Sequence, residues 1–391
     1  MMWKNVPFSE LVEFPPKIYL EKNELYDNIP MDVVDGGIKY VQEINQRVYT
    51  GGGAKFANGD TIFARITPCL ENGKIAKVKG LEKEVGFGST EFFVFRAKEN
   101  ISDPDFIYYL AKTDLVRQPA IKSMVGASGR QRADKGVVEQ IKVPNIPLPT
   151  QRRIASILSA YDDLIENNLK RIKLLEEKAA LSYHGILKRE TELKLLPLSQ
   201  LATITSSKRI FLSDYVEQGI PFYRSKEIIA KSNFESISKP LYITEARYSD
   251  IKEKFGVPIS GDLLITSVGT IGFIHLVNDD DEDFYFKDGN LIWIRKLIQQ
   301  NLKYFLFFKF RTPEFRKMLN SIAIGSSQKA LTIETVKKLE IKIPNDESLI
   351  EFNQEIKVII KFIYNLQKQN NKLREARDIL MPKLMNGEIE V

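Results

Sequence analysis

Two stretches of this chain place apolar residues at alternating steps of four and three. The first runs from Ile154 to Ile186 and the second from Phe352 to Leu384. This spacing is a heptad seam, which predicts a helix that packs along a partner helix. Each position of the second seam follows its counterpart by 198 residues (352 − 154 and 384 − 186), so the two seams share one phase. We therefore expect the two helices to pair as a coiled coil.

The seams also predict how the helices pair. If they run antiparallel with full overlap, facing residue numbers sum to 538, and Asn168 meets Asn370 inside an otherwise apolar seam. A buried asparagine that finds a partner of its own kind fixes register at some cost in stability. The same register sets Tyr161 against Arg377. In the alternative interpretation, each helix packs only on its own globular neighbour.

Composition sets outer limits on the fold and on the location. A chain of 391 residues with 43% apolar and 10% aromatic residues can bury two or three globular cores. Its net charge of +6 is only weak evidence for a nucleic-acid partner. The single cysteine, Cys69, excludes an intrachain disulfide and suits a reducing compartment. Because neither a signal peptide nor a membrane-spanning apolar run is visible, we expect a cytoplasmic protein without a membrane partner.

The segments that precede the two seams repeat as well. The matching pairs are Pro7–Leu11 with Pro197–Leu201, Asn58–Ile62 with Ser260–Leu264, Gly126–Arg132 with Gly325–Lys329, and Ile141–Pro144 with Ile341–Pro344. Short apolar runs between glycine-rich turns indicate strands, with some helix among them. The chain is therefore predicted to be an internal duplication of one structural unit. We expect an α+β protein in which two globular domains of mixed strand and helix are separated by two long helices that form an antiparallel coiled coil.

The expected boundaries follow from prolines and caps. We assign residues 1–148 to the first domain, 149–190 to the first spacer helix, 191–346 to the second domain and 347–391 to the second spacer helix. Thr150 is the expected N-cap of the first spacer helix, and Ser348 with Glu351 forms the expected capping box of the second. Asn386-Gly387 marks the end of the second. Within the first domain, Asp103–Val116 has helical spacing, with Leu115 among the residues of its buried side.

Catalytic signatures are missing from the sequence. It has no phosphate loop and no dinucleotide-binding glycine motif, and Phe14-Pro15-Pro16-Lys17 lacks the asparagine and the aromatic of an amino-methyltransferase site. His184 and His275 have no cysteine or carboxylate cluster at metal spacing. The acidic run Asp279–Asp283 is typical of a solvated turn. We therefore expect no catalytic residue, metal or cofactor in this chain.

Side chains suited to DNA lie where turns meet strands. The candidates are Arg47, Arg65, Lys74, Arg130, Gln131 and Arg132 in the first half, and Lys208, Arg209, Arg224, Lys226, Thr270, Gln328 and Lys329 in the second. Arginine, lysine and glutamine read guanine and adenine edges, and neighbouring glycine and serine allow close approach to phosphate. For any single residue the alternative is a solvated surface charge. The Gly-Ser-Gln-Lys/Arg loop recurs in both halves, which favours a binding role for it.

Several longer motifs resemble one known family. These are Pro147–Leu158 (PLPTQRRIASIL), Leu380–Ile389 (LMPKLMNGEI), Arg65–Lys74 (RITPCLENGK) and Thr266–Gly272 (TSVGTIG). Their order along essentially the whole chain resembles the specificity subunit of a type I restriction-modification system. The second lead-in, Ile343–Ser348, departs from the pattern because it lacks the Pro-Leu-Pro run and the following glutamine.

The resemblance implies a subunit without catalytic residues. Each globular unit, a target recognition domain, would read one half of a bipartite asymmetric site in double-stranded DNA. The coiled coil would set half-site spacing, since its 33 residues span roughly 48 Å against ~34 Å per DNA turn. It would also dock two methyltransferase subunits, with restriction/translocase subunits in the full complex, and S-adenosylmethionine, ATP and Mg would bind those partners. The alternatives are a duplicated protein–protein scaffold without base readout and an undetected nuclease.

Overall fold

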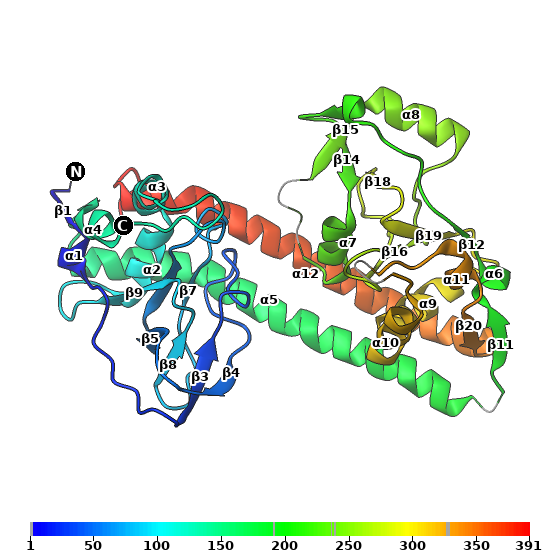
Figure 1. The fold of residues 1–391 in the computed structure, drawn as a ribbon, viewed down its shortest axis with the longest axis horizontal. Helices are drawn as coiled ribbons and strands as arrows, with labels where there is room; N and C mark the ends of the chain where they lie inside the picture. Colours follow the sequence, from blue (N-terminus) through cyan, green and yellow to red (C-terminus); the bar gives the residue numbers. More distant parts are fainter. Residues whose placement is uncertain (1–2, 191, 236, 238–239, 326–328) are drawn as a thin grey trace. The chain divides into compact units, whose positions relative to one another are not determined.

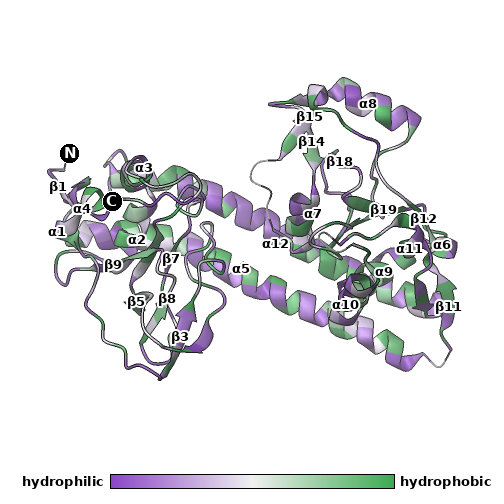
Figure 2. Ribbon diagram, in the orientation of Figure 1, coloured by the Kyte–Doolittle hydropathy of each residue, from purple (hydrophilic) through white to green (hydrophobic). Residues whose placement is uncertain are grey.

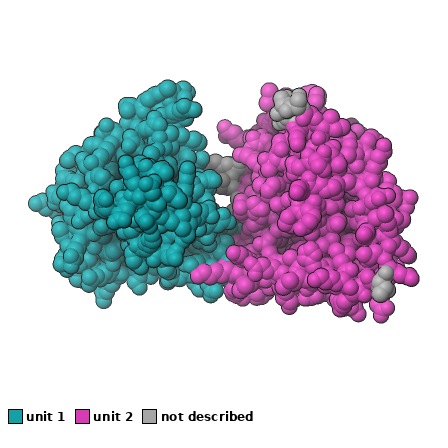
Figure 3. Space-filling model, turned by 60° about the horizontal axis from the view of Figure 1, so that its bottom comes forward, with its two compact units in different colours: residues 1–169, 369–391 teal, residues 170–368 magenta. Residues whose placement is uncertain are grey.

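The computed structural model describes residues 3–190, 192–235, 237, 240–325 and 329–391. The chain divides into two compact units, one of residues 1–169 with 369–391 and the other of residues 170–368 (Figure 3). Each unit contains one globular domain and a segment of each long helix. No helix in the described part of the chain has both the length and the apolarity needed to cross a membrane.

The first domain contains two four-stranded sheets and one short two-stranded sheet (Figure 1). One sheet is antiparallel throughout and has the order β2-β9-β6-β7, formed by Val12–Glu13, Phe92–Ala97, Thr61–Ala64 and Ile75–Lys77. The other has the order β4-β3-β8-β5, formed by Asn45–Val48, Leu25–Ile29, Val85–Gly88 and Ala54–Ala57, and its β3–β8 pair is parallel. In the short sheet, β1 (Asn5–Pro7) pairs with β10 (Lys142–Pro144).

Four short helices accompany these sheets: α1 (Phe8–Leu11), α2 (Pro104–Lys112), α3 (Asp114–Lys122) and α4 (Lys135–Gln140). The single helix predicted over Asp103–Val116 is wrong, because the chain breaks at Thr113. Asp103 caps α2, and Thr113 takes an extended conformation with ψ 154° before α3 begins. Leu115 consequently starts a new helix and is 42% exposed instead of buried.

The second domain repeats this plan, with the same strand order in its main sheet. In its second sheet the order differs, because the parallel pair lies at the edge instead of in the centre. Its main sheet is β12-β19-β16-β17, formed by Thr203–Thr205, Leu291–Arg295, Leu263–Thr266 and Ile274–Leu276. Its second sheet is β13-β15-β14-β18, formed by Tyr215–Val216, Leu241–Ile243, Ile220–Tyr223 and Tyr285–Phe286, again with one parallel pair, β14–β18. β11 (Lys194–Pro197) pairs with β20 (Glu340–Ile343) as β1 pairs with β10. The predicted internal repeat is confirmed.

The described residues of the second domain form the helices α6 (Leu198–Leu201), α7 (Ser225–Ser232), α8 (Glu245–Lys254), α9 (Leu302–Arg311), α10 (Pro313–Ile322) and α11 (Ile333–Lys337), and the 3-10 turn η1 (Leu212–Asp214). The aromatic helix α9 is almost wholly buried, with Phe305 and Phe310 fully enclosed. It lies in one apolar cluster with the strands β16 and β19 and with the α5 and α12 segments of the same unit. The long helices are thus part of the domain core.

One repeated turn shows how closely the two domains correspond. Asp60 and Asp262 are both buried, and each carboxylate accepts a hydrogen bond from the backbone N–H three residues earlier, at 2.8 Å and 3.1 Å. The second partner differs: Arg96 pairs with Asp60 at 2.8 Å, whereas the Trp293 Nε1 donates to Asp262 at 2.8 Å. The backbone role of the aspartate is therefore kept, while the side chain that donates a second hydrogen bond to its carboxylate has diverged.

The two long helices are α5 (Leu148–Arg189) and α12 (Asp346–Met385). The Thr150 cap is wrong, because α5 already begins at Leu148 and the Gln151 N–H bonds the Pro147 carbonyl at 2.9 Å. The capping box at Ser348 is also wrong. Asn345 caps α12 instead, since its Oδ1 accepts from the Ser348 N–H at 2.9 Å, which places Ser348 inside the first turn. The predicted end is confirmed by Gly387, which follows α12 with φ +78°.

The starts of the two long helices differ at one buried side chain. Gln151 is fully buried, and its Oε1 accepts from the Asp103 N–H at 2.9 Å. Its Nε2 donates to the carbonyls of Ile101 and Ile146. The residue 198 positions later is Leu349, which is 1% exposed in an apolar cluster. The glutamine missing from the second lead-in is thus replaced by an apolar contact at the same helical position.

The helices pack antiparallel in both units, and their apolar stripes are visible in Figure 2. In the first unit, the Asn168 Nδ2 donates to the Asn370 Oδ1 at 2.9 Å, and both side chains are buried. In the second, the Ser182 hydroxyl donates to Glu355 at 3.0 Å. The two asparagines meet as the sum of 538 requires. Because seam residues of α5 and α12 share apolar clusters, the interpretation that each helix packs only on its own domain is excluded.

Arg377 does not pair with Tyr161 as the seam arithmetic suggested. It is 1% exposed and forms an ion pair with the neighbouring residue, Asp162, which is also buried. A buried guanidinium requires an anion, and the phenol of Tyr161 cannot supply one. The Tyr109 hydroxyl donates to the same carboxylate at 2.5 Å, and burial together with the Asp162 charge raises the pKa of Tyr109. This network fixes the first domain to α5 and α12.

The acidic run was interpreted as a solvated turn, which is wrong for Asp281. Its side chain is only 7% exposed, and its carboxylate contacts the Lys231 Nζ at 2.7 Å and the His275 Nε2 at 3.0 Å. Burial raises the pKa of this carboxyl, but the His275 and Lys231 charges outweigh burial and lower it. Burial lowers the pKa of His275, which is 1% exposed. The Asp281 carboxylate is therefore anchored to the domain, while the other four residues of the run are exposed as predicted.

We expect the seam asparagines to be coupled. Asn168→Leu or Asn370→Leu alone should reduce the free energy of unfolding by about 1–3 kcal/mol, because the remaining buried amide loses its partner. The double change to leucine should recover most of this loss, since two apolar side chains then face each other. Urea unfolding followed by circular dichroism measures the free energy of unfolding of the two single variants and the double variant. A double variant less stable than both single variants would contradict the pairing.

The buried Asp281 predicts an acid-sensitive second domain. Asp281→Asn should destabilise the protein by about 3–5 kcal/mol at pH 7, because Lys231 stays buried without an anion. Because the folded-state pKa of Asp281 is lowered, wild type holds this stability above the unfolded-state pKa of ~3.9 and loses it as pH falls further. The difference in free energy of unfolding between the two proteins should therefore shrink progressively as the pH falls below about 4. Asp283→Asn, at a 65% exposed side chain, is the control and should change little.

Candidate nucleic-acid interface

Polar loops gather at one edge of the main sheet in the first domain. Because neighbouring strands of β2-β9-β6-β7 are antiparallel, the end of β2, the start of β9 and the end of β6 lie at the same edge. The segments found there are residues 14–20, 89–91 and 65–74. The Arg65 N–H bonds the Glu91 carbonyl at 2.9 Å, which joins two of these segments directly.

A further loop is fastened onto this edge. Val125 and Arg132 exchange two backbone hydrogen bonds, of 3.1 Å and 2.9 Å, which close the loop between them. Gln131 is held to Thr67 from both sides: its carbonyl accepts from the Thr67 N–H at 2.9 Å, and its N–H donates to the Thr67 hydroxyl at 3.0 Å. The Ala133 N–H bonds the Arg65 carbonyl at 2.7 Å. The two ends of the glycine-rich loop are thus held in place by backbone hydrogen bonds.

The second domain has the same loop pair. Ile324 and Ala330 exchange backbone hydrogen bonds of 2.9 Å and 2.8 Å. The Leu331 N–H bonds the Ser267 carbonyl at 2.8 Å, and the Gly269 N–H lies 3.4 Å from the Lys329 carbonyl. These four backbone contacts correspond to those of the first domain, whereas the bond to the Thr67 hydroxyl has no counterpart, because Gly269 stands at that position. Gln328, which the sequence analysis named, lies outside the described residues.

The predicted residues of the first domain fall into three groups. Arg130 is exposed and makes no ion pair with any described residue, and the Gln131 side chain is half-buried. Arg132 is held by Glu91 through two nitrogens, the shorter contact being 2.7 Å. Lys74 donates to the backbone carbonyl of Met31, in the segment after β3, at 2.8 Å. Arg47 lies on the edge strand β4 opposite Tyr26, near the start of β3, so it is not part of this loop edge.

Arg65 lies in a pocket of about 470 Å³ that opens at the same edge. Its Nε is buried and has no hydrogen-bond partner, and its guanidinium lies 4.8 Å from the centre of the Phe93 ring. Lys55 and Lys135 line the same pocket, and the Lys135 Nζ lies 5.4 Å from the Phe14 ring centre. With Phe92, which also lines the pocket, three cations and three aromatic rings converge in a space that anionic and aromatic groups can enter.

Sequence reasoning missed two parts of this pocket. It passed over Lys55, and it examined Phe14-Pro15-Pro16-Lys17 only as an incomplete methyltransferase motif. The available signal was the position of this segment after a strand, with an aromatic and a lysine beside the prolines.

The predicted residues of the second domain lie near the corresponding edge. Lys208 and Arg209 follow β12: the Lys208 Nζ lies 4.6 Å from the Phe255 ring centre, and Arg209 is 3.3 Å from Asp288. Arg224 and Lys226 share the buried carboxylate of Glu227, at 2.9 Å and 3.4 Å. Burial raises the pKa of Glu227, but Arg224 outweighs burial and lowers it. Thr270 and Lys329 are exposed on the paired loops.

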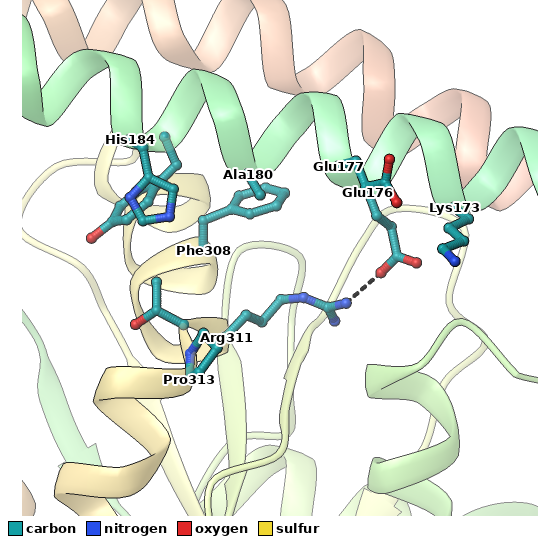
Figure 4. A pocket seen from close by; sticks show the side chains of 10 residues that line it. Lys173, Glu176, Glu177, Ala180, His184, Phe308, Arg311 and Pro313 are labelled. Carbon is teal, nitrogen blue, oxygen red and sulfur yellow. Dashed lines mark hydrogen bonds and ion pairs between the residues drawn. The ribbon is translucent and has the colours of Figure 1, made fainter. Parts of the chain in front are cut away.

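A smaller pocket of about 330 Å³ lies in the second unit, between α5 and the α9–α10 pair (Figure 4). Arg311 forms an ion pair with Glu176 across it. Burial raises the pKa of Glu176 and lowers that of Arg311. Its central charges satisfy each other, so this ion pair joins the domain to α5. Among the described residues, no group of three or more His, Cys, Asp or Glu side chains could hold a metal.

Comparison with known proteins identifies the family. The model of the type I restriction modification DNA specificity domain matches twice, at residues 2–177 and 191–377. The chain is similar to the type I restriction enzyme MjaVIII specificity subunit of Methanocaldococcus jannaschii, at 24% identity over 78% of this chain and 75% of the relative. It is similar to a putative type I restriction enzyme specificity subunit of Haemophilus influenzae, at 25% identity over 84% and 81%.

A solved structure shares the fold. The type I restriction-modification S subunit from M. genitalium aligns over 98% of this chain and 96% of its own length, with a TM-score of 0.54 at 14% identity. The two family matches coincide with the two halves of the internal repeat, each including its loop pair. This chain therefore belongs to the type I restriction-modification DNA specificity family, and it is a specificity subunit, the non-catalytic DNA-specificity component of such an enzyme.

Proposed function

We propose that each globular domain reads one half of a bipartite, asymmetric site in double-stranded DNA. The observation that carries this proposal is the loop pair fastened to the same sheet edge in both domains. The backbone bonds are the same, but the side chains differ: exposed Arg130 and half-buried Gln131 in the first domain, exposed Thr270 and Lys329 in the second. A shared scaffold with different hydrogen-bonding groups suits the recognition of two different base sequences.

The Arg65 pocket supports binding of the DNA sugar-phosphate backbone beside the loops that are proposed to read bases. A buried guanidinium Nε without a partner carries a desolvation cost that an acceptor would remove. A phosphate oxygen is such an acceptor, and Lys55 and Lys135 add positive charge around it. In this proposal, Arg65 positions the duplex, and the loop of Arg130 and Gln131 reads base edges.

The coiled coil is proposed to set the spacing between half-sites. Its register depends on the buried Asn168–Asn370 contact, so the length of helix between the two domains is fixed by sequence. A spacer with one register supports recognition of half-sites at one separation. Changing the helix length by whole heptads should then change the separation that the complex accepts.

Partner subunits are proposed to dock on the outer faces of the coiled coil. Leu164 and Phe362 occupy equivalent positions 198 residues apart and are 52% and 43% exposed. Leu181 and Ile379 form a second equivalent pair, at 71% and 55% exposed. A coiled coil buries its seam without these residues, so repeated exposed apolar positions support two equivalent docking surfaces. We assign them to two methyltransferase subunits.

The remaining chemistry is assigned to the partners. S-adenosylmethionine would bind the methyltransferase subunits, and ATP and Mg would bind restriction/translocase subunits in the full complex. The assembly would act on DNA in the cytoplasm.

Methylation mapping tests the proposal directly. Genomic DNA from cells with and without this gene should differ in methylation at one bipartite motif. Purified chain with its methyltransferase partners should bind a fragment carrying that motif, and binding should weaken steeply with salt because phosphate contacts release counterions. Unchanged methylation together with no DNA binding at any salt would favour the protein–protein scaffold instead.

Separate domains predict separable effects on the two half-sites. Gln131→Ala should weaken discrimination at one half-site by about 1–3 kcal/mol per lost base contact, and Lys329→Ala should affect only the other. Competition binding with DNA altered in either half-site measures both. Gln140→Ala, an exposed glutamine on α4, is the matched control. Equal effects on both half-sites would contradict two independent readers.

The docking surfaces predict a stepwise loss of partners. Leu164→Lys and Phe362→Lys should each remove one methyltransferase copy, and the double variant should remove both, because a charge cannot be buried in an apolar contact without a partner. Native mass spectrometry of the complex counts the copies. Leu195→Lys, at a 50% exposed leucine on β11, is the control and should keep both. A double variant that still binds two copies would show that docking occurs elsewhere.

A further inference from the structure

The two most exposed aromatic side chains among the described residues are Tyr19, at 81%, and Phe211, at 59%. Both lie on the loop that follows the first strand of the main sheet, β2 in one domain and β12 in the other. The surrounding sequences match in kind: Lys17-Ile18-Tyr19-Leu20 and Arg209-Ile210-Phe211-Leu212 each run basic, isoleucine, aromatic, leucine. An exposed ring thus recurs at the same place in both halves of the repeat.

In the second domain the ring projects from a rigid base. Ile210, just before Phe211, is 9% exposed and packs in an apolar cluster with strands β14 and β18. The Phe211 N–H donates to the Asp214 carboxylate at 3.0 Å, and the Arg247 guanidinium donates to the Arg209 carbonyl at 3.3 Å. Leu212, next in the chain, is 88% exposed. The backbone is fastened while Phe211 and Leu212 face water.

The first domain holds Tyr19 in a similar way. Leu20 is 3% exposed and packs with Tyr49 and Phe87, and Ile18 contacts the same cluster. The Glu21 N–H bonds the Tyr26 hydroxyl at 3.3 Å. Both neighbours of Tyr19 therefore point into the domain, so its ring is directed outward by the chain on either side. Its exposure results from packing of the flanking residues.

These loops are continuous with the proposed reading loops. In the second domain, Arg209 contacts Asp288 at 3.3 Å, and the Ser267 hydroxyl donates to the adjacent Gly289 carbonyl at 3.3 Å. Ser267 in turn accepts from the loop of Lys329. In the first domain, Phe14 lies five residues before Tyr19 and lines the same pocket as Arg65. Each aromatic loop leaves the sheet edge at which its domain presents Arg, Lys and Gln side chains.

A cation beside an exposed ring matches the chemistry of nucleic acid. Lys208 makes no ion pair with any described residue, and Arg209 and Lys17 stand next to the rings in sequence. Lysine and arginine attract phosphate, and an aromatic ring stacks on any base, which contributes about 1–3 kcal/mol per base. In duplex DNA the bases are already stacked on each other, so a ring gains this contact only by entering between them.

We infer that Tyr19 and Phe211 each wedge into one base-pair step of the DNA, in their respective half-sites, with Leu212 extending the second wedge. This inference rests on the proposed function. The wedge separates neighbouring base pairs and bends the duplex, so the cost of opening depends on the sequence of that step. Pyrimidine–purine steps open most readily, so each domain selects such a step without a hydrogen bond to its bases.

The test uses this chain in complex with its methyltransferase partners, on DNA that carries the mapped motif. The fluorescent base 2-aminopurine, which brightens when unstacked, is placed in turn at each position of both half-sites. Wild type should produce an increase at one step in each half-site. Tyr19→Ala should abolish only one increase and Phe211→Ala only the other, and each should weaken binding about 5- to 150-fold, the equivalent of one stack.

Two controls separate wedging from general damage. Tyr19→Phe keeps the ring and should keep the fluorescence increase in its half-site. Ile298→Ala alters a 61% exposed apolar side chain beyond the opposite end of β19 and should leave both increases intact. Native mass spectrometry of each variant checks that the methyltransferase subunits remain bound.

The outcomes are distinguishable. If wild type binds the motif and no position brightens, the wedge is overturned while the proposed function stands. Loss of both increases in either single variant overturns the assignment of one ring to each half-site. Loss of methyltransferase subunits from Phe211→Ala shows that the ring is a protein contact, which also overturns the inference. If wild type binds no DNA with its partners present, the proposed function itself fails.

Discussion

The buried contact between Asn168 and Asn370 constrains everything built on the long helices. Both side chains are buried and satisfy each other, with 2.9 Å between the donor nitrogen and the acceptor oxygen. A slip of one heptad would set Asn168 against Ile363 or Arg377 and leave buried amide groups without their partner. The buried ion pair of Arg377 with Asp162 demands the same register. Two polar contacts in an apolar seam therefore select one alignment.

The repeat separates what the fold needs from what recognition needs. Asp60 and Asp262 hold equivalent turns, and the backbone of Gln131 is tied to its neighbouring loop as the backbone of Lys329 is tied in the other domain. These bonds use backbone atoms or one short carboxylate, so the exposed side chains are free to change. Two domains with one scaffold can therefore present different chemistry to two half-sites.

Periodicity and repetition left clear marks in the sequence, so the seam, the duplication and the asparagine contact could be predicted. Features that depend on which groups meet in space could not. Asn345 rather than Ser348 caps α12, Asp162 rather than Tyr161 meets Arg377, and Asp281 is buried in what reads as an acidic turn. The same limit applies to the candidate site. Tyr19 sits in an ordinary apolar stretch, and only packing of both its neighbours shows that its ring must face water.

The ion pairs within the candidate interface shape its selectivity. Glu91 already holds Arg132, and Glu227 holds Arg224, so these guanidinium groups gain less from a phosphate than a free arginine would. They add little to sequence-independent binding, in keeping with a net charge of only +6. A base edge or phosphate must match the position of the carboxylate to replace it. Unpaired Arg130 and Arg65 can supply general affinity, whereas the paired arginines favour DNA whose shape brings an acceptor to the right place.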